Sequence, residues 1–333
     1  MTATAEMTHA GEPVAEQRPL LAPWCRTADD GSRLLFEHAG HVVELNGQAV
    51  RALLPALLPL LDGAHTVREI VATLGDSAEA PIRKALALLD EHGLLVDGPP
   101  AAGHASAACY VAANSALSPA EAWTALTSSR VAVIGSAPAG AEVTHLLGSA
   151  GVATTTLALA DGTVDHADLV VASPAPEEVE HLGALNERRL GDTTPWLPLL
   201  PTNGHFVAVG PLYVPGQTAC YACYLLRRGA TSGYEEDFSL LEGQPVRAPM
   251  PAAASMSAAG LAALICLRWL GAHDPTLPGV LYALELQGRL GLTRHRVLRV
   301  PRCPACGPTS PLPSPWFRGL DAGAAQQPSD AAR

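Results

Sequence analysis

Lysine is almost absent from this chain of 333 residues: Lys84 is the only one, and the other 20 of the 21 basic residues are arginine. Any mechanism that needs a lysine elsewhere is therefore excluded, which removes a phosphate-loop lysine, a Schiff base and a lysine-activated nucleophile. Charged residues make up only 16% of the chain. The net charge of −11 argues against a nucleic-acid-binding protein, because such a protein binds through a basic face.

Export signals, membrane spans and common catalytic motifs are missing as well. The first 23 residues have neither the basic region nor the apolar region of a secretory signal. The most apolar stretch, 252–267, is shorter than the roughly 20 residues of a membrane span and predicts a buried helix. There is no G-x-S-x-G or H-E-x-x-H motif. We therefore expect a cytoplasmic protein that has no membrane partner.

The first third of the chain predicts a small α+β domain over residues 21–98, after a disordered segment 1–20. Two β-prone runs around Ala39-Gly40 predict a hairpin over 33–45. Three helices and a short strand follow; the expected ranges are 49–63 (bent or interrupted by Pro55 and Pro59), 66–75 (with a Thr66/Glu69 capping box), 81–93 and 94–96. A hairpin, three helices and a strand follow one another in the order of a winged-helix domain.

The rest of the chain predicts a second domain of the α/β class. Residues 99–108 are small and rich in Pro and Gly, which indicates a linker. From Arg130 onward, apolar strands alternate with helices, and this pattern is typical of a parallel sheet covered on both faces. We expect this domain to span 109–310, with an unstructured segment over 311–333.

The strongest chemical signal is a pair of C-x-x-C motifs, Cys220/Cys223 and Cys303/Cys306, separated by 79 residues. Each motif offers two thiolates at the spacing that tetrahedral zinc prefers. Four cysteines leave no open coordination position, so the zinc would be structural. A redox dithiol and unrelated buried thiols are the alternatives.

A second, weaker signal is RVAVIGSAPAG, which has the form of a dinucleotide-type strand, turn and helix. Gly135 and Gly140 stand at the first and last glycine positions, but Ala137 replaces the middle glycine. Asp161 is a candidate for holding a ribose, or simply part of an Asp-Gly turn. These three residues, Gly135, Gly140 and Asp161, are at most a vestigial cofactor site.

The second domain resembles the ThiF/MoeB-like, ubiquitin-activating superfamily. The matching segments are RVAVIG with Gly140, DLVVAS, PWLPLLPTNGHFVAVGPLYVPGQTACYACYLLRR and RVLRVPRCPACG. The first domain, with ELNGQAVRALLPALLPLLDGAHTVREI and ALALLDEHGLLVDG, is similar to leader-peptide recognition elements. The combination resembles the ThiF-like partner proteins of thiazole/oxazole-modified microcin and thiopeptide pathways. It implies a Rossmann-like domain with a tetracysteine zinc site and a non-catalytic adaptor that presents a precursor peptide to a YcaO-type cyclodehydratase.

Departures from the adenylating branch of that superfamily imply that ATP is not a cofactor. Adenylating members carry Arg and Lys on the ATP phosphates, whereas here Gly135 and Asp168 are only 33 residues apart and no lysine follows Lys84. Ala172-Ser173 stands where active members have a metal-binding Asp, and no thioester cysteine lies between Cys223 and Met250. An ATP-dependent adenylating enzyme that acts on a peptide remains the alternative function.

The resemblance also implies that the leader adds a strand to the winged-helix sheet beside the third helix. The peptide-binding candidates are Leu34, Phe36, Val42, Val43, Arg83 and Lys84. The two basic residues would meet acidic leader residues or simply be solvated.

A DNA-binding winged helix is a further alternative, but 21–98 holds six basic and eleven acidic residues. The superfamily also suggests a homodimer.

Overall fold

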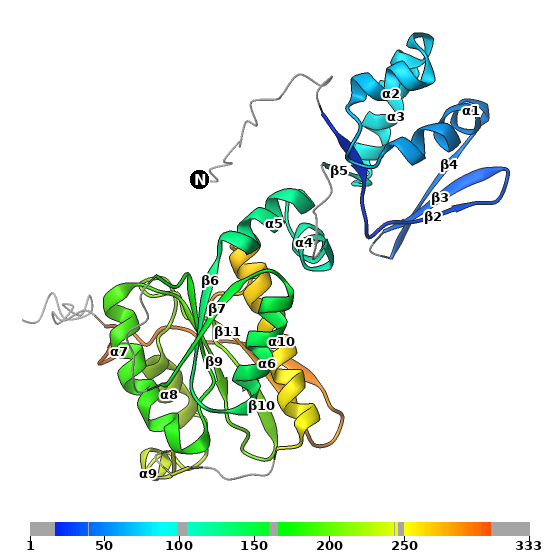
Figure 1. Ribbon diagram of the computed structural model, residues 1–333. Coiled ribbons are helices and arrows are strands. Elements are labelled where there is room, and N and C mark those ends of the chain that lie inside the picture. The colour runs from blue at the N-terminus through cyan, green and yellow to red at the C-terminus, as the bar shows by residue number, and fades with distance from the viewer. Residues whose placement is uncertain are drawn as a thin grey trace, which may run out of the picture.

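The computed structural model describes residues 17–38, 40–98, 105–159, 166–242, 244–245 and 250–307. We call residues 17–98 the first module and residues 105–307 the second module. The first module lies at the blue end of Figure 1, and the second module contains the large sheet and the longest helix.

The first module combines two small sheets with three helices. Its strands are β1 (Pro19–Leu21), β2 (Arg26–Asp29), β3 (Arg33–His38), β4 (His41–Asn46) and β5 (Leu95–Asp97). Its helices are α1 (Gln48–Leu57), α2 (Val67–Leu74) and α3 (Glu79–Glu91), with short 3-10 turns η2 (Leu58–Leu60) and η3 (Asp76–Ala78). The antiparallel sheet has the order β2-β3-β4, and β1 pairs with β5. The sheet therefore has two edges, β2 and β4.

Local signals in the sequence explain several of these boundaries. Thr66 caps α2 and forms the expected capping box with Glu69, so two N–H groups of the first turn are satisfied. Pro55 lies inside α1, and Pro59 lies in η2, where the helix tightens and ends. Helix α3 starts two residues before the expected Pro81. The core holds one face of the sheet and the inner faces of the helices: Leu34, Phe36, Leu45, Leu54, Leu57, Ile70, Ile82 and Leu89.

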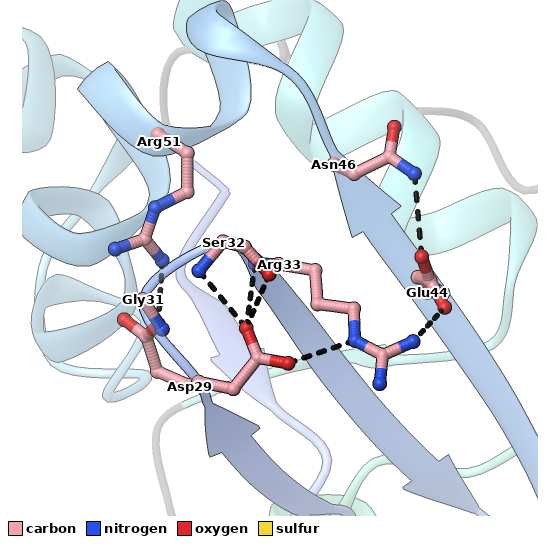
Figure 2. A network of polar contacts seen from close by, with 8 residues as sticks. Asp29, Gly31, Ser32, Arg33, Glu44, Asn46 and Arg51 are labelled. Atoms are coloured by element: carbon pink, nitrogen blue, oxygen red, sulfur yellow. Dashed lines mark hydrogen bonds and ion pairs between the residues drawn. The ribbon is translucent and has the colours of Figure 1, made fainter.

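Strand β2 was not expected, because Arg-Thr-Ala-Asp shows no alternation of apolar and polar residues and all four residues are exposed. Polar contacts hold it instead (Figure 2). Asp30 accepts hydrogen bonds from the backbone N–H groups of Ser32 and Arg33, which fixes the turn into β3. Arg51 on α1 forms an ion pair with Asp29 at 2.6 Å and ties the end of β2 to the helical layer.

The second module is built on one seven-stranded sheet of order β12-β11-β10-β9-β8-β6-β7. Its strands are β6 (Arg130–Ile134), β7 (Ala153–Leu157), β8 (Leu169–Ala172), β9 (Trp196–Leu200), β10 (Phe206–Val209), β11 (Val280–Glu285) and β12 (Leu292–Arg296). The pairs among β7, β6, β8 and β9 are parallel, whereas those among β9, β10, β11 and β12 are antiparallel. The expectation of a parallel sheet is thus wrong for the last three strands. For two of the three pairs the reason is local: short loops join β9 to β10 and β11 to β12, and short connections permit only antiparallel pairing.

Helices cover both faces of this sheet (Figure 1). They are α4 (Ala105–Ala112), α5 (Pro119–Ser128), α6 (Pro138–Ser149), α7 (Leu182–Asp192), α8 (Tyr221–Gly229), α9 (Phe238–Glu242) and α10 (Ala252–Ala272), with a 3-10 segment η4 (Pro176–His181). Helices α6 and α10 share one hydrophobic cluster with α4 and α5, whereas α7 and α8 contribute to a second cluster on the other face. By length and composition α10 is apolar enough to cross a membrane, but half of its most apolar stretch is buried against these neighbours.

The expected linker 99–108 is wrong at its C-terminal end. Helix α4 already begins at Ala105, and Ala108 is fully buried in the second module. The segment Ala-Ser-Ala-Ala has small side chains, which are typical of a linker. Alanine is also the best helix former, and contacts with α5 and α10 stabilise the helix here.

Candidate functional site: a cysteine cluster, a closed glycine turn and a cleft beside the first sheet

The four cysteines of the two C-x-x-C motifs meet in the structure. Their sulfur atoms all lie within 4.8 Å of one another. The Cys220 sulfur is 3.8 Å from that of Cys223 and 3.6 Å from that of Cys303, and the sulfurs of Cys223 and Cys306 are 3.5 Å apart. Zinc with four sulfur ligands at about 2.3 Å places the sulfurs about 3.8 Å apart, so the spacing fits a tetrahedral ion.

The local backbone holds this cluster in place. Cys220 caps the N-terminus of α8, where the helix dipole favours a thiolate, and Cys223 lies in the first turn of the same helix. The backbone N–H of Val300 donates a hydrogen bond to the Cys223 sulfur. Burial raises the pKa of Cys220, and burial has the same effect on Cys303, whose pKa is nevertheless lowered to about 7 by hydrogen bonds from the backbone of Cys306 and Ala305. Four neighbouring thiolates in such a buried site would need a cation between them, and the cluster has the donor set for one.

Arg299 links the cluster to the rest of the second module. Its guanidinium donates hydrogen bonds to the carbonyl oxygens of Gly216 at 3.1 Å and Cys306 at 2.9 Å. The cluster therefore joins α8 to the segment that follows β12, and an ion at this position would hold together two parts of the fold that are distant in sequence.

The glycine turn after β6 has the conformation that the sequence indicates. Gly135 has φ +107°, and a Cβ at this position would lie 2.3 Å from the Ser173 carbonyl oxygen. Gly140, in the first turns of α6, also lies against Ser173. Both glycines thus allow close packing of β6 and α6 on the segment after β8. Asp161, the third expected residue, lies outside the described residues.

A carboxylate of the chain itself occupies this turn. Glu178 in η4 accepts hydrogen bonds from the backbone N–H of Ser136 at 2.9 Å and of Ala175 at 2.8 Å. Burial by itself raises the pKa of Glu178, but the hydrogen bonds from Ser136 and Ala175 outweigh this effect and hold the pKa below its usual value. In dinucleotide-binding folds, N–H groups at this turn receive a phosphate of the ligand. Here Glu178 supplies the negative charge.

A small cavity of about 220 Å³ lies beside the turn, at the carboxyl ends of β6, β8 and β9. Its walls are mainly apolar, and none of the described residues that line it is charged; they include Ala137, Pro138, Ser173, Leu200, Met250 and Ala258. Ser173, which lines the cavity, is fully buried, as is its neighbour Ala172 at the end of β8. The described walls thus offer neither a cation for a triphosphate nor a carboxylate for its metal ion.

A larger cleft, of about 950 Å³, runs along the first module next to the loop between α4 and α5. Trp24 and His38 line it, with their rings 6.3 Å apart, and β2 begins two residues after Trp24. Helix α3 contributes Arg83 and Leu86. The cleft therefore combines aromatic, apolar and charged groups close to the start of β2, a strand whose four side chains are all exposed.

The six expected peptide-binding residues fall into different environments. Leu34 and Phe36 are buried in the core of the first module, so their side chains are not offered to a ligand. Val42 is 62% exposed on β4, whereas Val43 is half-buried against the core. On α3, Lys84 is exposed, and Arg83 lines the cleft while it forms an ion pair with Glu79 at 2.9 Å.

Three residues of these sites were not found from the sequence: Trp24, His38 and Glu178. Trp24 precedes a strand without a hydrophobic pattern, and His38 meets it only through the pairing of β2 with β3. The Pro-Glu-Glu sequence at the start of η4 is a signal for a helix N-terminus, but nothing in it points to Ser136, 42 residues earlier.

Comparisons with known proteins rest on structure, since no family profile and no curated protein sequence matches this chain. The structure of the heterocyclase TruD is similar, with a TM-score of 0.69 and 23% identity over 87% of this chain and 43% of the TruD chain. A heterocyclase in complex with substrate and cofactor gives a TM-score of 0.68 and 24% identity over 87% of this chain and 39% of that chain. This chain thus spans less than half of the length of either heterocyclase.

The second kind of structural neighbour matches over its whole length. Escherichia coli MccB has a TM-score of 0.62 and 15% identity over 88% of this chain and 98% of its own. Structures of MccB with ATP, and of the microcin C7 biosynthetic enzyme MccB in complex with N-formylated MccA, are also similar. These likenesses extend over both modules, and at this level of identity they establish that the chain has the fold shared by TruD and MccB.

Proposed function

We propose that this chain is a non-catalytic adaptor. It binds the leader of a ribosomally made precursor peptide and presents the peptide to a separate YcaO-type cyclodehydratase, which forms azoline or azole rings. In this proposal the first module is a winged-helix leader-recognition domain. The observation that carries the proposal is the cleft between α3, β5 and the segment that leads into β2, which is lined by Trp24, His38 and Leu86.

The chemistry of the cleft suits an extended peptide. Strand β2 pairs only with β3 among the described strands, so its outer edge leaves backbone N–H and C=O groups available for an added strand. Main-chain hydrogen bonds would supply affinity, and the aromatic pair and Leu86 would select apolar leader side chains. Arg83 forms an ion pair with Glu79, and its guanidinium would also meet an acidic residue of the leader.

The adaptor role, rather than adenylation, is supported by the second module. Glu178 places a negative charge on the N–H group of Ser136, where an adenylating enzyme needs room for a phosphate. A triphosphate would have to displace this carboxylate and would meet an apolar cavity without a charged residue among its described walls.

The cysteine cluster completes the proposal as a structural zinc site. Cys220, Cys223, Cys303 and Cys306 would hold the ion with no coordination position left for substrate. The chemistry that zinc supplies here is charge compensation and crosslinking of α8 to the loop after β12.

The decisive experiment titrates the full chain with a fluorescent peptide that copies the leader half of a short Cys/Ser/Thr-rich precursor encoded beside it. We expect saturable binding and no ATP–pyrophosphate exchange above background with the same peptide. Exchange that requires the peptide would instead establish the adenylating enzyme. Absence of saturable binding by a leader that the cognate cyclodehydratase needs would refute the adaptor.

A further inference from the structure

Strand β12 is the outermost strand of the large sheet on the side away from β7. Among the described strands it pairs only with β11, from Val280↔Arg296 to Leu284↔Leu292. All five of its residues, Leu292–Arg296, are exposed. The second module therefore ends in an edge that presents one row of backbone N–H and C=O groups to its surroundings.

Positive charge is concentrated on and around this edge. Residues 286–307 contain five of the chain's 21 basic residues and no acidic residue, although the chain as a whole carries a net charge of −11. The five are Arg289, Arg294, Arg296, Arg299 and Arg302. We call this strand and its arginines the basic edge.

None of the five arginines forms an ion pair within the described part of the chain, and four of them also lack a hydrogen bond that would hold the guanidinium inside the fold. Arg299 is used internally, through its bonds to the carbonyl oxygens near the cysteine cluster. Arg294 lies over the Tyr282 ring at 5.8 Å, which positions its guanidinium without neutralising it. Arg289, Arg296 and Arg302 are exposed, and no carboxylate of the described residues pairs with them.

Apolar side chains accompany these charges. Alternate residues of a strand share a face, so Leu292, Arg294 and Arg296 point to the same side of β12. Leu292 is 52% exposed, and Leu298, just after the strand, is 56% exposed. Such a mixture of exposed leucine and unneutralised arginine is complementary to a segment that alternates acidic and apolar residues.

We propose that the basic edge docks an extended acidic segment of another protein. The segment adds to the sheet as an eighth strand, and its carboxylates lie against Arg294 and Arg296. A second copy of this chain is disfavoured, because antiparallel self-pairing of β12 places arginines of one copy opposite or beside those of the other. Nucleic acid is disfavoured by the net charge of −11 and by an edge of backbone groups that matches a strand.

The test uses the full chain and a capped ten-residue peptide that alternates glutamate with valine. A matched peptide has glutamine in place of glutamate. Fluorescence anisotropy is expected to show at least tenfold tighter binding of the glutamate peptide, and hydrogen exchange is expected to slow at β12 amides when it binds. The double variant Arg294→Glu/Arg296→Glu is expected to lose at least tenfold in affinity, and the double glutamine variant is expected to lose an intermediate amount.

The control Arg130→Glu reverses an exposed charge on β6, outside both proposed sites, and is expected to leave this binding within twofold. The variant Arg83→Glu/Lys84→Glu makes the double change of charge on α3, in the other cleft, and is expected to lose less affinity than the β12 variant. Thermal melting of each variant verifies that the exposed substitutions leave the fold intact. Equal binding of both peptides, or no binding, would overturn the proposal. The arginines would then serve only to prevent aggregation through the exposed strand edge. If the α3 variant loses more affinity than the β12 variant, the acidic segment binds in the other cleft. If a short RNA of equal charge displaces the glutamate peptide, the basic edge binds nucleic acid. Neither result depends on the leader titration, so the adaptor proposal and this one fail separately.

Discussion

Glu178 and Ser136 are joined by a 2.9 Å hydrogen bond in which a backbone N–H of the glycine turn donates to a side-chain carboxylate of the same chain. The same carboxylate oxygen accepts from Ala175, so one charge satisfies two N–H groups on different segments. The glycine turn is thereby complete without a bound anion.

This contact predicts a pH-dependent contribution to stability. The folded-state pKa of Glu178 lies below its usual value, so its stabilising effect is present above the unfolded pKa and is lost as pH falls through the folded pKa. Glu178→Gln is expected to lower the free energy of unfolding by about 1–2 kcal/mol at pH 7. Urea unfolding of both proteins at pH 7 and near pH 3 checks this, and a difference that stays constant or grows in acid would contradict it.

Replacement of Gly135 by alanine is expected to destabilise the second module strongly. The added Cβ would meet the Ser173 carbonyl at 2.3 Å in a backbone conformation with φ +107°. We expect a loss of about 3 kcal/mol or more. Gly260→Ala is the matched control: Gly260 lies inside α10 with open space around its Cβ position, and a gain of up to about 1 kcal/mol is expected from helix propensity. Similar effects of the two substitutions in chemical unfolding would rule out the close contact.

Loss of one cysteine ligand is expected to remove the metal and to destabilise the second module. The purified chain should contain about one zinc ion per chain by elemental analysis. Cys303→Ser should lose this metal and melt at least about 5 °C lower, since a structural zinc ion contributes folding free energy. Cys109→Ser, a half-buried cysteine on α4 outside the cluster, should retain the metal. Full zinc content in the Cys303 variant would argue against a four-cysteine site.

Substitution in the cleft is expected to weaken leader binding. Trp24→Ala removes an aromatic wall of the cleft, and we expect at least a tenfold higher Kd for the leader peptide. Val42→Glu changes the opposite edge of the same sheet and is expected to alter the Kd by less than threefold. The reverse ranking of these two variants would assign the peptide to the β4 edge.

Short-range signals made much of the fold predictable. The Thr66/Glu69 capping box, the two prolines at the end of the first helix and the C-x-x-C spacings each act within a few residues, and the structure confirms the elements they predict. Alternation over 33–45 likewise predicts the β3–β4 hairpin, and Leu34 and Phe36 share one face of it.

Long-range partners were not predictable from such patterns. Alternation does not tell whether Leu34 and Phe36 face a core or a pocket, because that depends on where α1 and α3 pack. Strand β2 depends on Arg51 and Asp30 rather than on apolar residues. Glu178 contacts Ser136 only because the fold brings η4 next to the turn after β6. The spacing of residues along the sequence does not predict this contact.

Because the two cysteine pairs are far apart in sequence, they are synthesised at different times. Cys220 and Cys223 leave the ribosome about 80 residues before Cys303 and Cys306, and α10, β11 and β12 are made in between. The parallel strands β6 to β9 are complete before that, so half of the sheet can form while the first two thiols still lack their partners. Capture of a zinc ion by all four thiols would therefore follow synthesis of β11 and β12, and zinc content would report the fraction of chains in which the two cysteine pairs have met.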